Sequence, residues 1–283
     1  MPDPIGRAPP TLLAAAPRLP HALPMPARAR PSRWTTIALP LAFAASLVEG
    51  ALIVFAATPP EAAPAPPPAP AEPKRGRIDG TVTLHGEPPK PQVPAARPGD
   101  PGYAFCKDRQ APADEVRIHD GHLAEAFVRI SVGEVKGDFA PPEGPVKLLF
   151  SGCAVTPRVQ GAVVGQEIEI RSADTTEHDI HIRRGDEPWK NQIISSGKGT
   201  VLEVLDAPGL MTVTCENHPL ERAFVFVSDH PFFAVTDAEG RFVLPDVPVG
   251  HYGLESWHER FGTQRVVAEV TEKQLVVDLA YGW

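Results

Sequence analysis

The stretch TVTCENHPLERAFVFV, residues 212–227, places a cysteine and a histidine between two apolar runs of the kind that form β-strands. Side chains alternate between the two faces of a strand, so Met211, Val213 and Cys215 share one face. That face is the apolar one, and Cys215 is therefore expected to point into a core at the end of its strand. His218 follows three residues later, in the turn. A thiol and an imidazole so placed are two candidate metal ligands.

A second stretch, EHDIHIRR at residues 177–184, supplies a third candidate. The same alternation groups His178 with Ile180 and Ile182 and leaves His181 on the opposite, polar face. His178 is the inward histidine, and His181 is expected to be solvated. Two imidazoles and one thiolate suit copper, because soft sulfur favours Cu(I) and imidazole suits both oxidation states.

Residues 146–227 resemble the cupredoxins, the plastocyanin and amicyanin group. The resemblance is carried by CAVTPRVQGAVVGQEIEIRSADTTEHDI, residues 153–180, and by TVTCENHPLERAFVFV. It implies a Greek-key β-sandwich in which His178, Cys215 and His218 are the equatorial ligands of one copper ion. The sequence departs from the amicyanin pattern at Glu221, where those sites carry an axial Met. Glu221 is thus a candidate axial ligand, with rotation into solvent as the alternative. Asp179 also departs from the pattern, since Asn usually follows the first histidine ligand.

Two further blocks, residues 77–135 and 229–283, flank a central domain predicted to span 136–228. Their turn and core motifs, including TDAEGRF and PVGHY, resemble the carboxypeptidase regulatory-like domain, a transthyretin-like β-sandwich. The order of the motifs implies a cupredoxin domain inserted into that sandwich. The resemblance implies no chemistry for the flanking blocks. The predicted fold class is all-β, with two β-sandwiches.

The N-terminal part of the chain has a different composition. Residues 1–34 are rich in Pro, Ala and Arg and read as a disordered cytoplasmic tail. Residues 35–57 are apolar over about the 20 residues that a transmembrane helix needs, and a cleaved signal peptide is the alternative reading. Residues 58–76 form a Pro/Ala-rich linker. Because the arginines precede the apolar segment, the positive-inside rule predicts a single-pass anchor in the cytoplasmic membrane with periplasmic C-terminal domains, or secretion if the segment is cleaved.

Export permits disulfides, and Cys106 and Cys153 remain once Cys215 is assigned to a metal. A Cys106–Cys153 disulfide is therefore predicted, with two unpaired thiols as the alternative. Cys106 lies in a Pro/Gly-rich stretch expected to be irregular, and Cys153 is expected just before the first strand of the cupredoxin-like segment. The other histidines are expected to be structural or solvated, among them His119, His122, His230, His251 and His258. Trp189 and Trp257 are expected to be packing residues.

Three functions fit these features. The first is a membrane-tethered copper protein that exchanges electrons with a redox partner protein. The second is a copper protein that stores, delivers or senses the metal. The third is a structural β-sandwich protein in which zinc, held by the same residues, staples a loop. A net charge of −8 argues against nucleic acid as a partner, and the absence of a catalytic motif argues against an enzyme.

Overall fold

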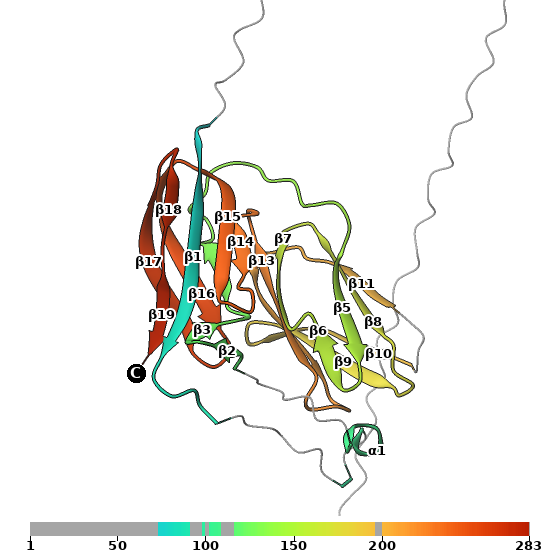
Figure 1. The fold of residues 1–283 in the computed structure, drawn as a ribbon. Coiled ribbons are helices and arrows are strands. Elements are labelled where there is room, and N and C mark those ends of the chain that lie inside the picture. Colours follow the sequence, from blue (N-terminus) through green and yellow to red (C-terminus); the bar gives the residue numbers. More distant parts are fainter. Residues whose placement is uncertain (1–72, 91–97, 100–101, 109–115, 196–199, 283) are drawn as a thin grey trace, which may run out of the picture. The chain divides into compact units, whose positions relative to one another are not determined.

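The computed structural model describes residues 73–90, 98–99, 102–108, 116–195 and 200–282. Their regular secondary structure is almost entirely β-strand (Figure 1), as predicted; the short helix α1 (Tyr103–Cys106) is the exception. The predicted tail at 1–34 and the predicted anchor at 35–57 lie outside the described residues, as does the linker up to residue 72. Within the described ranges no helix is long and apolar enough to cross a membrane.

The first β-sandwich, called here the metal-site sandwich, has a five-stranded and a four-stranded sheet. The five-stranded sheet runs in the order β10 (Glu187–Ile194), β9 (His178–Arg184), β12 (Gly209–Cys215), β13 (Arg222–Ser228) and β7 (Val159–Val163). The other runs β11 (Thr200–Val204), β8 (Glu167–Ser172), β5 (Val146–Ser151) and β6 (Ala154–Thr156). Most pairs are antiparallel, but β13 with β7 and β5 with β8 are parallel.

The strand phases predicted from the sequence are confirmed in this sandwich. His178, Ile180 and Ile182 are buried on β9, and Met211, Val213 and Cys215 are buried on β12. The apolar ones and Cys215, with Ile168 and Ile170 of β8, belong to one core cluster of this sandwich. Alternate residues of each strand point into this core. The inward residue at the end of a strand therefore lies at the edge of the core.

The second β-sandwich has its own core. One sheet is centred on β1 (Arg75–His85), which pairs with β15 (Arg241–Pro248), β3 (His122–Leu123), β18 (Gln274–Val276) and β19 (Leu279–Gly282), while β2 (Ile118–His119) pairs with β3. The other sheet runs β14 (Phe233–Val235), β4 (Phe127–Ile130), β16 (Gly250–His258) and β17 (Gly262–Val270). Its predicted Asp237–Gly240 turn is present, with the Gly240 amide donating to the Asp237 carbonyl. The regulatory-like assignment of this sandwich stays a prediction.

The two sandwiches contact each other through aromatic side chains. Phe226 of β13 stacks on Phe127 of β4 with ring centroids 4.2 Å apart, and Trp257 of β16 meets the Phe226 ring at 4.9 Å. A partly buried ion pair between Arg158 and Glu259 also joins the two sandwiches. Trp257 is therefore a packing residue, as predicted.

Two local expectations were wrong. Cys153 follows the first strand of the metal-site sandwich instead of preceding it, because Gly152 and Cys153 adopt positive φ angles of 64° and 67° and turn the chain from β5 into β6. The stretch around Cys106, expected to be irregular, contains the single helical turn of α1. The predicted Cys106–Cys153 disulfide is confirmed, with the two Cα atoms 5.8 Å apart.

Candidate metal centre

The candidate centre lies where β9 begins and β12 ends. His178 is the first residue of β9 and Cys215 is the last of β12. These strands are antiparallel neighbours in which Cys215 pairs with Ile180, so the histidine and the thiol emerge at the same rim of the core. Strand phase alone therefore brings two of the predicted ligands together.

The β12–β13 loop supplies the other two through consecutive turns. The His218 amide donates to the Cys215 carbonyl at 3.3 Å, and the Glu221 amide donates to the His218 carbonyl at 2.9 Å. The Glu216 amide also donates to the Asp179 carbonyl at 3.0 Å, which fixes the loop to β9. Two turns of three residues each return the side chains of Cys215, His218 and Glu221 to the same side.

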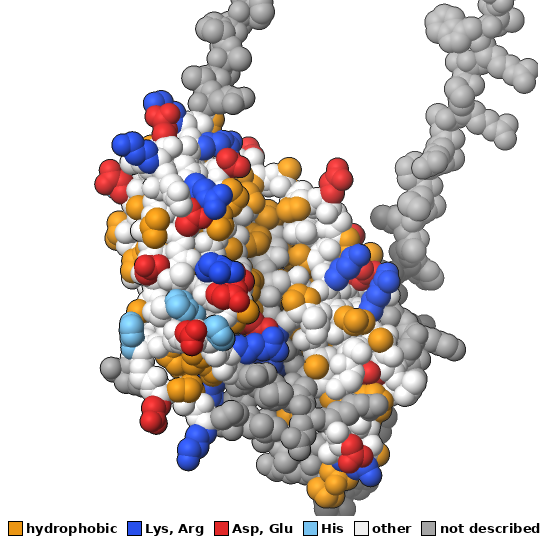
Figure 2. Space-filling view, viewed as in Figure 1, with side chains coloured by type: hydrophobic (Ala, Val, Ile, Leu, Met, Phe, Trp, Pro, Cys, Tyr) orange, Lys and Arg blue, Asp and Glu red, His pale blue; other side chains and the backbone are white. Residues whose placement is uncertain are grey.

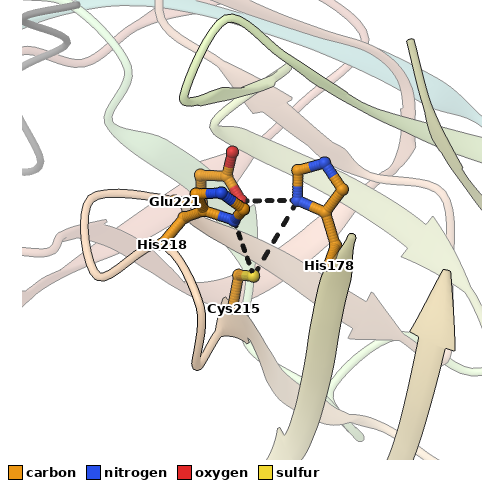
Figure 3. Close-up of side chains that lie close together, drawn as sticks. All are labelled: His178, Cys215, His218 and Glu221. Atoms are coloured by element: carbon orange, nitrogen blue, oxygen red, sulfur yellow. Dashed lines mark hydrogen bonds and ion pairs between the residues drawn. The ribbon is translucent and has the colours of Figure 1, made fainter. Parts of the chain in front are cut away.

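The four side chains converge on one point (Figure 3). Cys215 Sγ lies 3.3 Å from His218 Nδ1 and 3.8 Å from His178 Nδ1. Glu221 Oε2 lies 2.9 Å from His178 Nδ1 and 3.4 Å from His218 Nδ1. All four potential ligand atoms lie within 4.8 Å of one another. Glu221 thus points into the cluster, and the alternative in which it rotates into solvent is not what the structure shows.

The cluster is closed to solvent. The exposed fractions are 0% for His178, 3% for Cys215, 1% for His218 and 1% for Glu221. Burial, together with the nearby charge of Glu221, raises the pKa of the Cys215 thiol to about 12. Burial also lowers the pKa of His218, although the same carboxylate acts against this shift. The protein alone therefore holds a neutral thiol and a neutral His218 imidazole near pH 7, and binding a metal would displace the thiol proton.

These residues fit a metal ion by their chemistry. The buried atoms that face one another are His178 Nδ1, His218 Nδ1, Cys215 Sγ and Glu221 Oε2. A thiol, two imidazole nitrogens and a carboxylate oxygen are the donors that copper and zinc accept. Among the described residues, this is the group of four whose ligand atoms lie close enough to share an ion.

One residue that the sequence analysis did not identify lies beside the centre. Asp174, in the β8–β9 loop, is 7% exposed and its Oδ2 lies 3.6 Å from His178 Nε2. Its Oδ1 accepts a hydrogen bond of 2.7 Å from the Gly152 amide. At this distance the Asp174 carboxylate is a neighbour of the His178 ring, beside the nitrogen that does not face the cluster, and not its hydrogen-bond partner. The only sequence signal was an acid four residues before His178, which loops often contain by chance.

Among the described residues, the other histidines do not belong to this cluster. His181, on the opposite face of β9, is partly exposed and pairs with Asp179 and Glu216. His119 and His122 face each other across the short β2–β3 pair of the second sandwich. Histidine side chains are visible on the surface of that sandwich in Figure 2, whereas the four cluster residues are buried.

Fold and site together define an all-β protein of two sandwiches with a buried thiol, imidazole and carboxylate cluster able to hold a metal ion. Comparison with protein-family models and with curated proteins finds no match. Solved structures similar to part of the chain include cupredoxins and a copper-containing nitrite reductase. A purple cupredoxin from Nitrosopumilus maritimus is 18% identical, covers 29% of this chain and 99% of its own, and has a TM-score of 0.26.

Amicyanin from Paracoccus versutus is 14% identical over 35% of this chain and 98% of its own, with a TM-score of 0.27. A copper-containing nitrite reductase from Thermus scotoductus is 23% identical, and the match covers 35% of this chain but 25% of the reductase, again with a TM-score of 0.27. At this level the similarities are weak and partial. The case for a metal centre therefore rests on the four converging side chains.

Proposed function

We propose that this chain is a mononuclear copper protein of the cupredoxin type that transfers electrons. One observation carries the proposal: Cys215 Sγ, two imidazole Nδ1 atoms and a carboxylate oxygen meet in a buried cluster at the rim of a β-sandwich. Copper bound there would supply a one-electron couple between Cu(I) and Cu(II).

The chain's own residues would hold the ligands nearly fixed through that change. His178 is packed edge-on against Phe150 at a centroid distance of 5.2 Å, with Asp174 behind its other nitrogen. Cys215 is held at a strand end and His218 and Glu221 in hydrogen-bonded turns. A site that cannot relax far between oxidation states loses little energy to reorganisation, which suits electron transfer.

The test is a Cu(II) titration of the full-length protein followed by optical absorption and electron paramagnetic resonance. We expect one Cu(II) per chain and intense visible absorption from the thiolate. The colour should bleach with a one-electron reductant and return on oxidation. A colourless protein that takes up one zinc ion in preference to copper would overturn the proposal.

A second candidate is metal binding without electron transfer, and the buried Glu221 carboxylate favours it. A hard oxygen donor stabilises Cu(II) or Zn(II), and Cys, two His and Glu form an acceptable closed zinc site. Reduction potential separates the candidates: an electron carrier must cycle reversibly, whereas a site locked in one state stores metal or staples the loop.

We further propose that residues 35–57 anchor the chain in the cytoplasmic membrane with residues 77–283 outside the cytoplasm, where a redox partner protein would meet them. The apolar length after an Arg-rich tail supports this. Membrane fractionation and protease accessibility test it. Recovery of a soluble protein beginning near Ala45 or Ala57 would show a cleaved signal peptide instead.

We also propose that the second sandwich is of the carboxypeptidase regulatory-like type, because of its TDAEGRF and PVGHY motifs.

A further inference from the structure

We propose that α1 is a permanent cover over the metal centre, held by the Cys106–Cys153 disulfide, and that the metal is therefore resident and not cargo. The cover is defined as residues 102–108. This inference rests on the proposed function, because it concerns the same site. It chooses between electron transfer and metal delivery, which the ligand set alone does not separate.

The cover lies directly on the outer edge of His218. The Gly102 amide donates to the Asn217 carbonyl at 2.8 Å, and the Phe105 ring meets the His218 ring edge-on with centroids 6.1 Å apart. A Cβ atom on Gly102 would lie 2.2 Å from His218 Cδ2 and 2.6 Å from Nε2, so only glycine lets the backbone approach this closely. The space between the cover and the loop is about 10 Å³. Because one water molecule needs at least roughly 10 Å³, this space can hold one water at most.

The disulfide connects this cover to the turn beside the other imidazole. Cys106 ends α1, and Cys153 lies in the β5–β6 turn. In that turn the Gly152 amide binds Asp174, whose second oxygen faces His178 Nε2. One covalent link thus ties together the backbone beside His218 and the backbone beside His178.

The Cys106–Cys153 disulfide has the burial of a structural disulfide and not of a redox switch. Cys106 is 5% exposed and Cys153 is 0% exposed. Thiol–disulfide exchange requires a thiolate to reach one of the sulfurs, and neither sulfur is open to a protein dithiol. The cover is therefore expected to stay closed in the folded protein.

A closed cover has opposite consequences for the two functions. Delivery requires an incoming ligand, such as a thiol of an acceptor protein, to bind the metal before it leaves. With His178, Cys215, His218 and Glu221 all buried, such a ligand can approach only if a covering segment moves, and on the side of His218 that segment is the cover. Electron transfer needs no atom to pass the cover.

The test measures how fast Cu(I) is lost from the loaded full-length protein to bathocuproine disulfonate, a coloured Cu(I) chelator. In the wild-type protein, we expect a slow rate that becomes independent of chelator concentration, because opening of the cover limits it. In the Cys106→Ser/Cys153→Ser protein, the rate should rise at least about tenfold and increase with chelator concentration. Ala104→Ser, on the exposed side of α1, is the matched control and should keep the wild-type rate.

Phe105→Ala provides a variant that keeps the disulfide, in case the double variant does not fold. It removes the ring contact with His218 and should accelerate loss in the same direction. The inference would be overturned if the rate of Cu(I) loss from the wild-type protein were proportional to chelator concentration over the whole range. Equal rates in all four proteins would also overturn it. Failure to bind copper at all would instead refute the proposed function, so the two failures are distinguishable.

Discussion

Two pairs of buried histidines in this molecule look alike by exposure and differ in what their ring nitrogens contact. In the metal-site sandwich, Nδ1 of His178 and Nδ1 of His218 both face Cys215 and Glu221. Around the second sandwich, Nδ1 of His258 accepts the Arg260 amide and Nδ1 of His230 accepts the Phe232 amide, each at 3.2 Å. All four side chains are 0–2% exposed.

The difference shows that burial of a histidine does not by itself identify a ligand. His230 and His258 satisfy a local backbone amide in the turn that follows them, which is a structural role. His178 and His218 direct the same atom away from the backbone, toward a thiol and a carboxylate. The direction of Nδ1 therefore separates the candidate site from structural histidines better than burial does.

The largest expected effect is on the first pair. His178→Ala removes one of the four converging donors and should abolish stoichiometric Cu(II) binding and visible colour. His181→Ala, three residues along the same strand but on its outer face, should leave both nearly unchanged. Equilibrium dialysis with metal analysis, together with the optical spectrum, measures the difference. Loss of binding only in the His181→Ala protein would contradict the strand phase and with it the proposed site.

Much of this site could be predicted from the sequence because strand periodicity carries the information. Alternation fixed the inward faces of Cys215 and His178, and a three-residue spacing indicated the turn to His218. The disulfide followed from the cysteine count. Glu221 was a candidate because of its position in the loop, but its burial could not be read from the sequence.

The parts that could not be predicted depend on tertiary contacts between distant segments. Gly102 and Phe105 are about a hundred residues from His218, and no local pattern relates them. Asp174 lies beside His178 in a loop that accepts a hydrogen bond from the Gly152 amide. The aromatic contact between Phe127 and Phe226 joins residues that each read as ordinary strand positions. Sequence periodicity specifies which face is buried, but not what lies against it.

The next largest effect concerns the contact between the two sandwiches. Phe226→Ala removes a ring that stacks on Phe127 and meets Trp257, and should lower the free energy of unfolding by about 3–5 kcal/mol. The Cu(II) spectrum should not change, since this ring faces away from the metal-site core. Urea unfolding monitored by circular dichroism measures the loss. Val267→Ala, on an 82% exposed side chain, is the control and should have little effect. A changed copper spectrum in Phe226→Ala would show that the two sandwiches are not independent.

A smaller effect is expected from His258, the structural histidine. Burial, reinforced by the nearby charges of Arg158 and Arg260, lowers the pKa of His258 from its usual 6.5 to about 4. The unfolded chain then binds more protons than the folded one between these values, so stability should fall as the pH drops from about 6.5 to about 4. At pH 5 the free energy of unfolding should be lower by on the order of 2 kcal/mol because of His258.

Urea unfolding at pH 7 and pH 5 measures this loss of stability. His258→Gln cannot ionise and isolates the histidine from the carboxylates that titrate in the same range. The variant should be less sensitive to pH than the wild-type protein. Equal pH dependence in the two proteins would show that His258 is not held neutral.

The smallest effect in energy, and the finest probe of the site, is the replacement of Glu221. A carboxylate oxygen adds negative charge and hard donation, so it favours Cu(II) over Cu(I) more than a neutral thioether does. Glu221→Met should therefore raise the reduction potential and shift the spectrum toward intense blue absorption. For a one-electron couple, about 60 mV corresponds to a tenfold change in the equilibrium constant, so a shift of a few tens of millivolts is measurable by redox titration.

Glu221→Gln is the matched control, because it keeps the shape and the oxygen donor but removes the charge. A potential that rises in both variants would assign the effect to charge, whereas a rise in Glu221→Met alone would assign it to the donor atom. Unchanged potential and spectrum in both would mean that the carboxylate, although buried 2.9 Å from His178 Nδ1, does not act on the metal.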